Sequence, residues 1–339
     1  MIYNLQIGPK TVRETTTVSS THNETIGFPI LNIGVDSYIV SSQIHTSLDL
    51  NQDYTHSIHI GKYCSIATNM TMMIDLNHDY KSITTSAASF LRPHNTSKLI
   101  RKGQIIIQND VWIGNQVILM SGIKIGNGAV IGAGTVVSKD IPPYAIAVGN
   151  PCKIIKYRFT DEQIEKLQLI RWWDFEGSYL NEISEYFTSD VDVFIDKFYP
   201  HALAQKKKLY DLNLELKKTT YLFFPDFYES FSVWKNVITS YCTSFSDKDD
   251  VSLLIYIDKT FDTANQINCI DMVVSTFPVS PDIYLVCDSL SDERLLFMQA
   301  DYFITSRCKE TVQRTTFADE FSVKVLSGAD IPIFNFNKL

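Results

Sequence analysis

Residues 107–137 read IQNDVWIGNQVILMSGIKIGNGAVIGAGTVV, and an apolar residue recurs at every sixth position of this stretch. A period of six fits neither the 3.6 residues of a helical turn nor the simple alternation of a strand. It fits a coil of three short strands, each of which points one apolar side chain inward. Glycines that follow these apolar residues are expected to permit tight corners. The apolar positions are Ile107, Ile113, Leu119, Ile125, Ile131 and Val137, and the glycines are Gly114, Gly126 and Gly132.

The repeat continues upstream of this stretch. Two earlier blocks, 33–39 and 60–66, share its six-residue phase, so the coil is expected to span about residues 30–155. A polar interruption at about 75–104 separates the blocks, and a long loop inside a regular element is usually functional. Prolines between 142 and 151 are expected to end the coil, because proline lacks the amide donor of a paired strand.

The chain changes character after the coil. Thr160 and Gln163 form a capping-box pair, which predicts the start of a helix and a helical connector over 160–218. From about residue 219, short apolar runs alternate with helical stretches, which indicates a small parallel α/β sheet. We therefore expect an N-terminal coil domain over 1–159 and a Rossmann-like α/β accessory domain over 219–339.

Composition limits the classes of function. The 339 residues are 45% hydrophobic and 20% charged, as in soluble globular proteins, and the net charge is −8. An acidic surplus does not suit a general nucleic-acid binder, which must neutralise phosphates. The six cysteines lack CxxC spacing and are expected to be reduced, and neither a signal peptide nor a membrane span is evident. We expect a cytoplasmic protein that does not insert into membranes.

A histidine at the start of the interruption is the candidate general base. His78, in LNHDY, has a side chain that exchanges protons near neutral pH. Asp79 is a candidate to orient His78 or an acceptor hydroxyl, although adjacent residues of an extended chain point to opposite sides. His56 and His59 lie three residues apart, but no third ligand accompanies them, so no metal site is expected.

About half of the chain, residues 30–175, resembles the hexapeptide acyltransferases. The xenobiotic acetyltransferases, which modify chloramphenicol and streptogramins, are the most similar branch, and the galactoside and maltose acetyltransferases are also similar. The segments that carry the resemblance are IGKYCSIA at 60–67, NH at 77–78, NDVWIG at 109–114, IGAGTVVSKDIPPYAIAVGNPCKIIKYRF at 131–159 and RWW at 171–173.

The resemblance implies a left-handed parallel β-helix and a homotrimer with acetyl-CoA bound in a groove between neighbouring coils. A loop would reach across to the next subunit, so that each active site is shared between subunits. His78 matches the family's catalytic histidine, which takes a proton from an acceptor hydroxyl as that hydroxyl attacks the thioester. Lys156 replaces an arginine common in relatives, which keeps the positive charge without the bidentate fork. The positions that match family cofactor contacts or an aromatic next to the active site are Asn115, Ala133, Ser138, Lys139, Lys156 and Trp112.

The interruption is the candidate acceptor site. Tyr80, Phe90 and Arg92, together with Asp79, could offer a stacking surface and polar groups to a sugar or an amphipathic drug. An insertion of this composition could equally cover the coil of a neighbouring subunit.

The last part of the sequence faintly resembles the nucleotide-sugar-binding half of two-domain glycosyltransferases. Glu310 is present in the matching segment, but Ala318 stands where a second glutamate is common. No glycine-rich phosphate loop follows a strand, so a noncatalytic module is favoured. Such a domain is an unusual attachment for a drug-resistance enzyme, and it directs the choice of acceptor towards a glycan.

The leading hypothesis is an acetyl-CoA-dependent O-acetyltransferase that acts on a carbohydrate hydroxyl of a capsular, lipopolysaccharide or other surface glycan or its precursor. Four alternatives remain open. They are O-acetylation of an antibiotic, N-acetylation of a nucleotide-linked amino sugar, a bifunctional enzyme that also transfers a sugar, and a noncatalytic trimeric scaffold that binds glycans.

Overall fold

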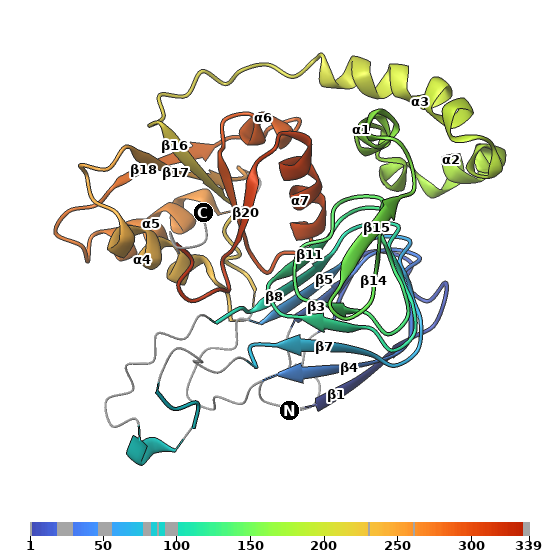
Figure 1. Cartoon of the computed structure of the whole chain (residues 1–339). Helices are drawn as coiled ribbons and strands as arrows, with labels where there is room; N and C mark the ends of the chain where they lie inside the picture. The colour runs from blue at the N-terminus through green and yellow to red at the C-terminus, as the bar shows by residue number, and fades with distance from the viewer. Residues whose placement is uncertain are drawn as a thin grey trace.

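The N-terminal half is a stack of coils, in which each turn of the chain adds one short parallel strand to each of three faces (Figure 1). The computed structural model describes residues 2–18, 30–46, 56–76, 83–86, 88–91, 101–229, 231–259 and 262–334. The first face contains β3 (Ile30–Ile33), β5 (Ser57–Ile60), β8 (Gln104–Ile107) and β11 (Ile123–Ile125). The second face contains β6 (Ser65–Ile66), β9 (Trp112–Ile113), β12 (Val130–Ile131) and β14 (Ala145–Val148). The third face contains β7 (Met70–Ile74), β10 (Ile118–Met120) and β13 (Val136–Val137).

Longer and antiparallel strands complete the coil. β4 (Tyr38–Thr46) bends around a corner, because its start pairs with β6 and its end pairs with β7. β1 (Ile2–Ile7) pairs with β4, β2 (Thr16–Val18) pairs with β3, and β15 (Lys153–Tyr157) pairs with β14, all antiparallel. The parallel strands fall where the six-residue period predicts them.

One apolar side chain from each short strand fills the centre of the coil. All six residues of the ladder are buried, from Ile107 to Val137, and they belong to one continuous core. Burying a side chain of this size stabilises the fold by about 1.5–3 kcal/mol. The period of six therefore reflects one inward position per face.

The glycines of the repeat serve close packing between coils. The chain turns at its corners through residues with positive φ, which are non-glycine at Asp110 and Gln116 and glycine at Gly122, Gly128 and Gly134. Gly114 is not one of the positive-φ residues, but a Cβ there would lie 2.7 Å from the backbone nitrogen of Ala133 in the next coil. The expected role of Gly114 in the corner conformation is therefore wrong, because the constraint is the distance to the next coil.

A helical connector follows the coil (Figure 1) and packs along the corner between its first and second faces, where it contacts Lys62, Tyr63 and Asn127. The capping box of Thr160 and Gln163 is confirmed, and α1 packs with α3 in a separate hydrophobic cluster. The elements are α1 (Asp161–Ile170), η3 (Trp172–Asp174), α2 (Gly177–Glu182), η4 (Ser184–Thr188) and α3 (Val191–Lys206).

The expectation of helical structure up to residue 218 is wrong beyond α3. Residues 209–217 have no regular secondary structure, and Leu212, Leu214 and Leu216 pack against the α/β sheet. Alternation of leucine with polar residues is the period of an extended chain and not of a helix. This segment therefore follows the sheet as an extended strap.

The remaining residues form an α/β region with a five-stranded parallel sheet of order β18-β17-β16-β19-β20. The strands are β16 (Thr219–Phe223), β17 (Val251–Ile257), β18 (Asp282–Cys287), β19 (Tyr302–Thr305) and β20 (Lys324–Ser327). The helices are α4 (Trp234–Ser244), α5 (Thr263–Val274), α6 (Arg294–Phe297) and α7 (Thr311–Glu320). In such sheets the order reverses between the two central strands, here β16 and β19, and ligands commonly bind outside their carboxyl ends. None of the helices in the described ranges is long and apolar enough to cross a membrane.

The α/β region lies against the first face of the coil. Figure 1 shows α7 beside β11 and β5, and the segment after β19 also reaches the coil. Polar residues that project from this face are buried beneath it. They include Asn32, His59, Gln104 and Gln108. The second and third faces are not covered by the described parts of the α/β region.

Candidate functional site

Two of the predicted cofactor residues meet at the corner between the second and third faces. Asn115 and Ala133 lie on successive coils, and the backbone N–H of Gly134 donates to the carbonyl of Asn115 at 2.8 Å. The side-chain oxygen of Asn115 accepts from the N–H and the hydroxyl of Thr68, at 3.2 and 3.1 Å. Asn115 and Ala133 are both exposed. This corner therefore presents an accessible edge of backbone that runs along the coil.

The second face carries Trp112 and continues to Lys156. The Trp112 side chain points outward from β9 and is 57% exposed. Lys156 lies on β15, which is three strands further along because β9, β12, β14 and β15 pair in that order. At the usual strand spacing this separation is roughly 14 Å. Trp112 thus lies near Asn115, and Lys156 lies further along the same face.

Ser138 and Lys139 lie apart from these residues. They follow β13 at the corner between the third and first faces, and both are exposed. Ala133 lies in the turn before β13, and Ser138 follows that strand, so β13 separates them. Of the six predicted cofactor residues, Asn115, Ala133 and Trp112 therefore lie together. Lys156 lies further along the second face, and Ser138 and Lys139 lie at the far edge of the third face.

The predicted catalytic and acceptor residues fall mostly outside the described part of the chain. His78, Asp79, Tyr80 and Arg92 are not described. Phe90 belongs to the short 3-10 turn η2 (Ser89–Leu91), and its side chain is 80% exposed.

The end of β7 leads directly into this segment. Asp75 follows β7 in a left-handed conformation, with φ of 51°. Its carboxylate Oδ2 lies 3.6 Å from Nε2 of His56, and Nδ1 of His56 lies 2.8 Å from the hydroxyl of Thr46. Asp75 and His56 are both largely buried. The strand that precedes His78 therefore ends in a packed polar contact.

His59 is a buried residue of the first face. Its Nδ1 lies 3.1 Å from Nδ2 of Asn32, and its Nε2 lies 3.1 Å from the hydroxyl of Ser57. Because the amide nitrogen of Asn32 can only donate, Nδ1 accepts and the proton of the neutral ring is on Nε2. Burial and the nearby charge of Arg307 lower the pKa of His59 to about 3. Both ring nitrogens are engaged within the protein, which does not suit a metal ligand.

An amide and a guanidinium join the first face to the α/β region. Nε2 of Gln104 donates to the hydroxyl of Ser57 and to the carbonyl of Ser306, and Oε1 accepts from the hydroxyl of Thr305. The Arg307 side chain is 1% exposed and donates to the carbonyl of His56 at 3.1 Å. Asn32 in turn donates to the carbonyl of Arg307. This contact is a buried network of hydrogen bonds.

The side-chain carboxyl group of Asp226 lies at the carboxyl ends of β16 and β19. The carboxylate of Asp226 accepts from the backbone N–H groups of Val233, Trp234 and Arg307 at 3.0–3.2 Å. Burial raises the pKa of Asp226. The start of α4 is where a phosphate would bind in a nucleotide site of this topology. A carboxylate at that position would repel a phosphate, which weakens the glycosyltransferase alternative.

A groove of about 550 Å³ lies on the third face, where β1, β4 and β7 meet. Amide and hydroxyl side chains line it, and the apolar residues among its described lining are Leu5 and Met70. The polar residues include Asn4, Gln6, Ser41, Gln43, Asn69 and Thr71. Groups of this kind donate and accept hydrogen bonds without charge, as a hydroxylated neutral ligand requires.

Comparison with known proteins assigns a family to the coil. The profile described as bacterial transferase hexapeptide (six repeats) matches residues 104–139. A probable macrolide acetyltransferase of Lysinibacillus sphaericus is 39% identical over 139 residues, which cover 39% of this chain and 77% of that protein. This chain belongs to the hexapeptide-repeat acetyltransferases. The acetyltransferase resemblance seen in its motifs is confirmed.

Two further similar proteins are also named as acetyltransferases. A chloramphenicol acetyltransferase of Klebsiella aerogenes is 40% identical to this acetyltransferase over 131 residues, covering 37% of this chain and 62% of that protein. The solved structure of a maltose O-acetyltransferase from Clostridium difficile 630 is 34% identical, covers 34% of this chain and 57% of that chain, and gives a TM-score of 0.25. Each match leaves more than half of the present acetyltransferase uncovered.

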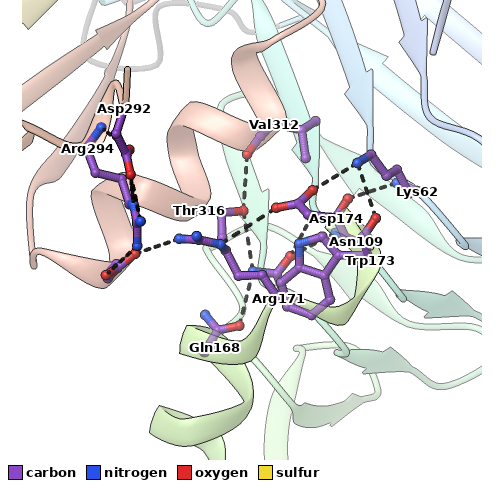
Figure 2. Close-up of polar contacts among 12 residues, drawn as sticks. Lys62, Asn109, Gln168, Arg171, Trp173, Asp174, Asp292, Arg294, Val312 and Thr316 are labelled. Atoms are coloured by element: carbon purple, nitrogen blue, oxygen red, sulfur yellow. Dashed lines mark hydrogen bonds and ion pairs between the residues drawn. The ribbon is translucent and has the colours of Figure 1, made fainter. Parts of the chain in front are cut away.

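The RWW segment of the acetyltransferase forms a junction between its three regions (Figure 2). Nη1 of Arg171 donates to Oε2 of Glu320 at 2.7 Å, and its Nε lies 3.6 Å from Oδ2 of Asp174. Nζ of Lys62 donates to Asp174 at 2.8 Å and to the carbonyl of Trp173 at 3.2 Å. The segment therefore ties the coil and the connector to α7.

Sequence reasoning missed Arg307, Asp226 and the contact of His56. Arg307 and His56 are 251 residues apart in the chain, so no local pattern connects them. The available signal was the polar character of outward positions on the first face, where Asn32 and His59 recur one coil apart. By itself that pattern is equally typical of a solvated face.

Proposed function

We propose that the protein is an acetyl-CoA-dependent O-acetyltransferase that transfers acetyl to a hydroxyl of a carbohydrate. The acceptor oxygen attacks the thioester carbonyl, the carbon–sulfur bond breaks, and coenzyme A leaves as the thiol. The base accepts the hydroxyl proton and can return it to the departing sulfur. The 39% identity to an acetyltransferase, over most of that relative, is the observation that carries this proposal.

His78 is the proposed general base. Asp75, which follows β7, lies three residues before it in the sequence, and the third-face groove includes Thr71 of that strand. A backbone N–H held rigidly near the thioester would stabilise the oxyanion that forms. No metal is required for this direct transfer.

The corner around Asn115 and Ala133 is the proposed contact for the pantetheine arm. Its exposed backbone can pair with the amide groups of that arm, and Trp112 borders it. Lys156, Ser138 and Lys139 supply positive charge or hydroxyl groups towards the nucleotide end. The separation of these two groups on one coil supports a cofactor site that is completed by a second subunit.

A carbohydrate acceptor is supported by the groove on the third face. Neutral amides and hydroxyls, such as Asn4, Gln43 and Thr71, match the hydroxyl groups of a sugar. Asp79, Tyr80, Phe90 and Arg92 are the proposed acceptor contacts from the interruption. A surface glycan or its precursor is the acceptor class we favour.

Acetylation of an antibiotic is the second candidate. Its support is the names of the curated relatives, which are a probable macrolide acetyltransferase and a chloramphenicol acetyltransferase. These drugs expose larger apolar surfaces than a sugar does. They would suit a more apolar site than the described groove provides.

The proposal includes a left-handed coil and a cytoplasmic homotrimer with shared active sites. The second face supports such an assembly, because outward residues from successive strands there are apolar and accessible. Trp112 is 57% exposed, and Val40 at the adjoining corner is 43% exposed. A second copy of the chain would cover these side chains.

The test is mass spectrometry of acceptors incubated with acetyl-CoA and the full chain. The panel contains maltose, a thiogalactoside, capsular oligosaccharides, chloramphenicol and a streptogramin. We expect an increase of one acetyl group on an oligosaccharide and none on the drugs. Acetylation of a drug alone would establish the second candidate in its place.

The role of His78 is tested with His78→Ala, and His201→Ala in the exposed part of α3 is the matched control. Loss of a general base lowers kcat by about 10²–10⁴-fold. The control should keep the rate of the unmodified protein. Full activity of His78→Ala would remove His78 from the mechanism.

A further inference from the structure

We propose that the groove where β1, β4 and β7 meet is a saccharide subsite that selects uncharged sugar units over acidic ones. Asn4, Gln43 and Thr71 are its specificity-determining residues. The inference rests on the proposed carbohydrate acetylation and narrows its class of acceptor. It also gives a role to β1, which lies outside the residues that the hexapeptide profile matches.

The groove follows from the way β1 is added to the third face. Alternate residues of β1 pack against the core of the coil, so Asn4 and Gln6 point outward. Asn4 pairs with Gln43 on β4, and Gln43 pairs with Thr71 on β7. Paired residues of neighbouring strands lie about 5 Å apart on the same side of a sheet. These three side chains therefore form one polar row across the groove.

The polar residues of the third face are concentrated in this groove. The same row continues over β10 and β13 as Ile118 and Val136. A second outward row contains His45, then Met73 and Met120 on the next two strands. Outward residues beyond the groove are thus largely apolar, although they belong to the same sheet. Contact with water alone does not account for a polar cluster at one end of the face.

Contacts within the groove hold its side chains and leave donors for a ligand. Nε2 of Gln43 donates to Oδ1 of Asn4 at 3.3 Å, and Oε1 of Gln43 lies 3.2 Å from Nε2 of His45. The backbone N–H of Asn69 donates to the hydroxyl of Ser41 at 2.9 Å. A side-chain amide carries two N–H donors. The amide nitrogens of Asn4 and Asn69 donate to no other residue in the part of the chain that the structure describes.

The charge of the groove decides which saccharides it suits. Its described lining contains no charged side chain. A sugar hydroxyl both donates and accepts, as amides and hydroxyls do, so the two sets of groups are complementary. The carboxylate of a uronic or sialic acid would lose water there without gaining a cation, which is costly. The volume of about 550 Å³ lies within the range of about 300–1,000 Å³ that is usual for ligand sites.

The experiment measures binding of the full chain to an array of oligosaccharides. The array carries oligomers of glucose, galactose and mannose, with oligomers of uronic and sialic acids of matching length. Asn4→Leu and Gln43→Leu remove amide groups of the groove, and Asn4→Lys places a cation in it. The matched controls are Asn181→Leu and Asn181→Lys, at an exposed position of α2.

The wild type should bind neutral oligosaccharides and should bind the acidic ones more weakly. Loss of one hydrogen bond should weaken neutral binding about fivefold in Asn4→Leu and in Gln43→Leu. Asn4→Lys should bind acidic oligosaccharides about fivefold more tightly than the wild type does, and both controls should match the wild type. Preference of the wild type for acidic glycans, full binding by both leucine variants, or no binding of any glycan would each overturn the inference.

Folding and assembly are checked in the same variants. Asn4 and Gln43 are exposed, so their substitution should leave the unfolding temperature and the sedimentation coefficient unchanged. A smaller species for Asn4→Lys would identify the groove as a contact between copies of the chain and would overturn the subsite.

Kinetics separate this inference from the proposed function. With a neutral oligosaccharide, Gln43→Leu should raise the KM for the acceptor about fivefold and leave the KM for acetyl-CoA unchanged. If an oligosaccharide is acetylated with the same acceptor KM by both proteins, the subsite fails and the proposed function stands. If no carbohydrate is acetylated but Gln43→Leu weakens binding on the array, the proposed function fails and the groove remains a saccharide site.

Discussion

The first and second faces of the coil have opposite relations between polarity and exposure. Outward residues of the first face are polar and buried, as Asn32 and His59 show. Outward residues of the second face include apolar side chains that are partly accessible, such as Trp112, Val130 and Ile146. The inward residues of both faces are alike, because both fill the same core.

The outward residues of a repeat therefore indicate what covers each face of the coil. The first face is covered by the α/β region through hydrogen bonds, so its polar groups are satisfied within the chain. An apolar face is stable in water only at a cost of about 25 cal/mol per Å² of exposed apolar surface. The second face is therefore suited to cover by another protein surface.

The largest effect is expected from removing the hydrogen bonds of the first face. Gln104→Met would remove three buried hydrogen bonds, one each to Ser57, Thr305 and Ser306. We expect the free energy of unfolding to fall by about 3 kcal/mol, as measured by urea denaturation. Gln43→Met on the accessible third face should change it by less than about 0.5 kcal/mol. Equal losses would mean that the cover contributes no stability.

Acid should lower the free energy of unfolding, because His59 on the first face is buried in its neutral form. Its pKa is about 3 in the folded chain against a usual value of 6.5, so the unfolded chain binds the extra proton between these values. Stability is full above pH 6.5 and declines as the pH falls from 6.5 towards 3. Between pH 7 and pH 5 this residue should account for a loss of about 2 kcal/mol.

The measurement is urea unfolding of the wild type and of His59→Gln across pH 5–7.5. Glutamine has no titrating proton in this range, so the variant should show a flatter dependence on pH. A slope identical to that of the wild type would show that His59 does not control the acid response.

A charged substitution on the second face should weaken self-association of the chain. Trp112→Lys places a charge where we propose that a second copy packs, while Tyr228→Lys, at a 69% exposed site of the α/β region, is the control. Sedimentation velocity at micromolar concentration should give a smaller species for the first variant alone. An unchanged oligomer would leave the apolar second face without its proposed partner.

The smallest effect is expected at Lys156, where arginine would restore the bidentate fork common in relatives. At an exposed site we expect the KM for acetyl-CoA to fall about twofold in Lys156→Arg, which is about 0.4 kcal/mol. Lys156→Gln should raise it. If both variants have the KM of the wild type, this residue does not contact the cofactor.

Local patterns predicted the parts of the fold that depend on local chemistry. The inward ladder from Ile107 to Val137 and the cap at Thr160 follow from spacing alone. The helix predicted for the extended strap was wrong. The lysines before it favour a helix, whereas Leu212 and its alternating neighbours fit an extended chain against the sheet.

The cover of the first face was not predictable from local patterns. Asn32 bonds to a residue 275 positions away, and a polar outward residue has the same appearance in sequence whether water or protein covers it. The grouping of Asn115 with Ala133 could be predicted, because both positions recur at one corner of the repeat. The separation of Ser138 from that corner required the arrangement of the faces.

The contact between His56 and Arg307 also sets an order of events during synthesis. The coil leaves the ribosome first, but the arginine that donates to the His56 carbonyl is translated 251 residues after it. At about 5–20 residues per second, this interval is about 10–50 s. During that time, the polar side chains of the first face lack the α/β region that buries them in the complete fold. Water or a chaperone must therefore satisfy these polar groups until the last strands of the chain have been synthesised.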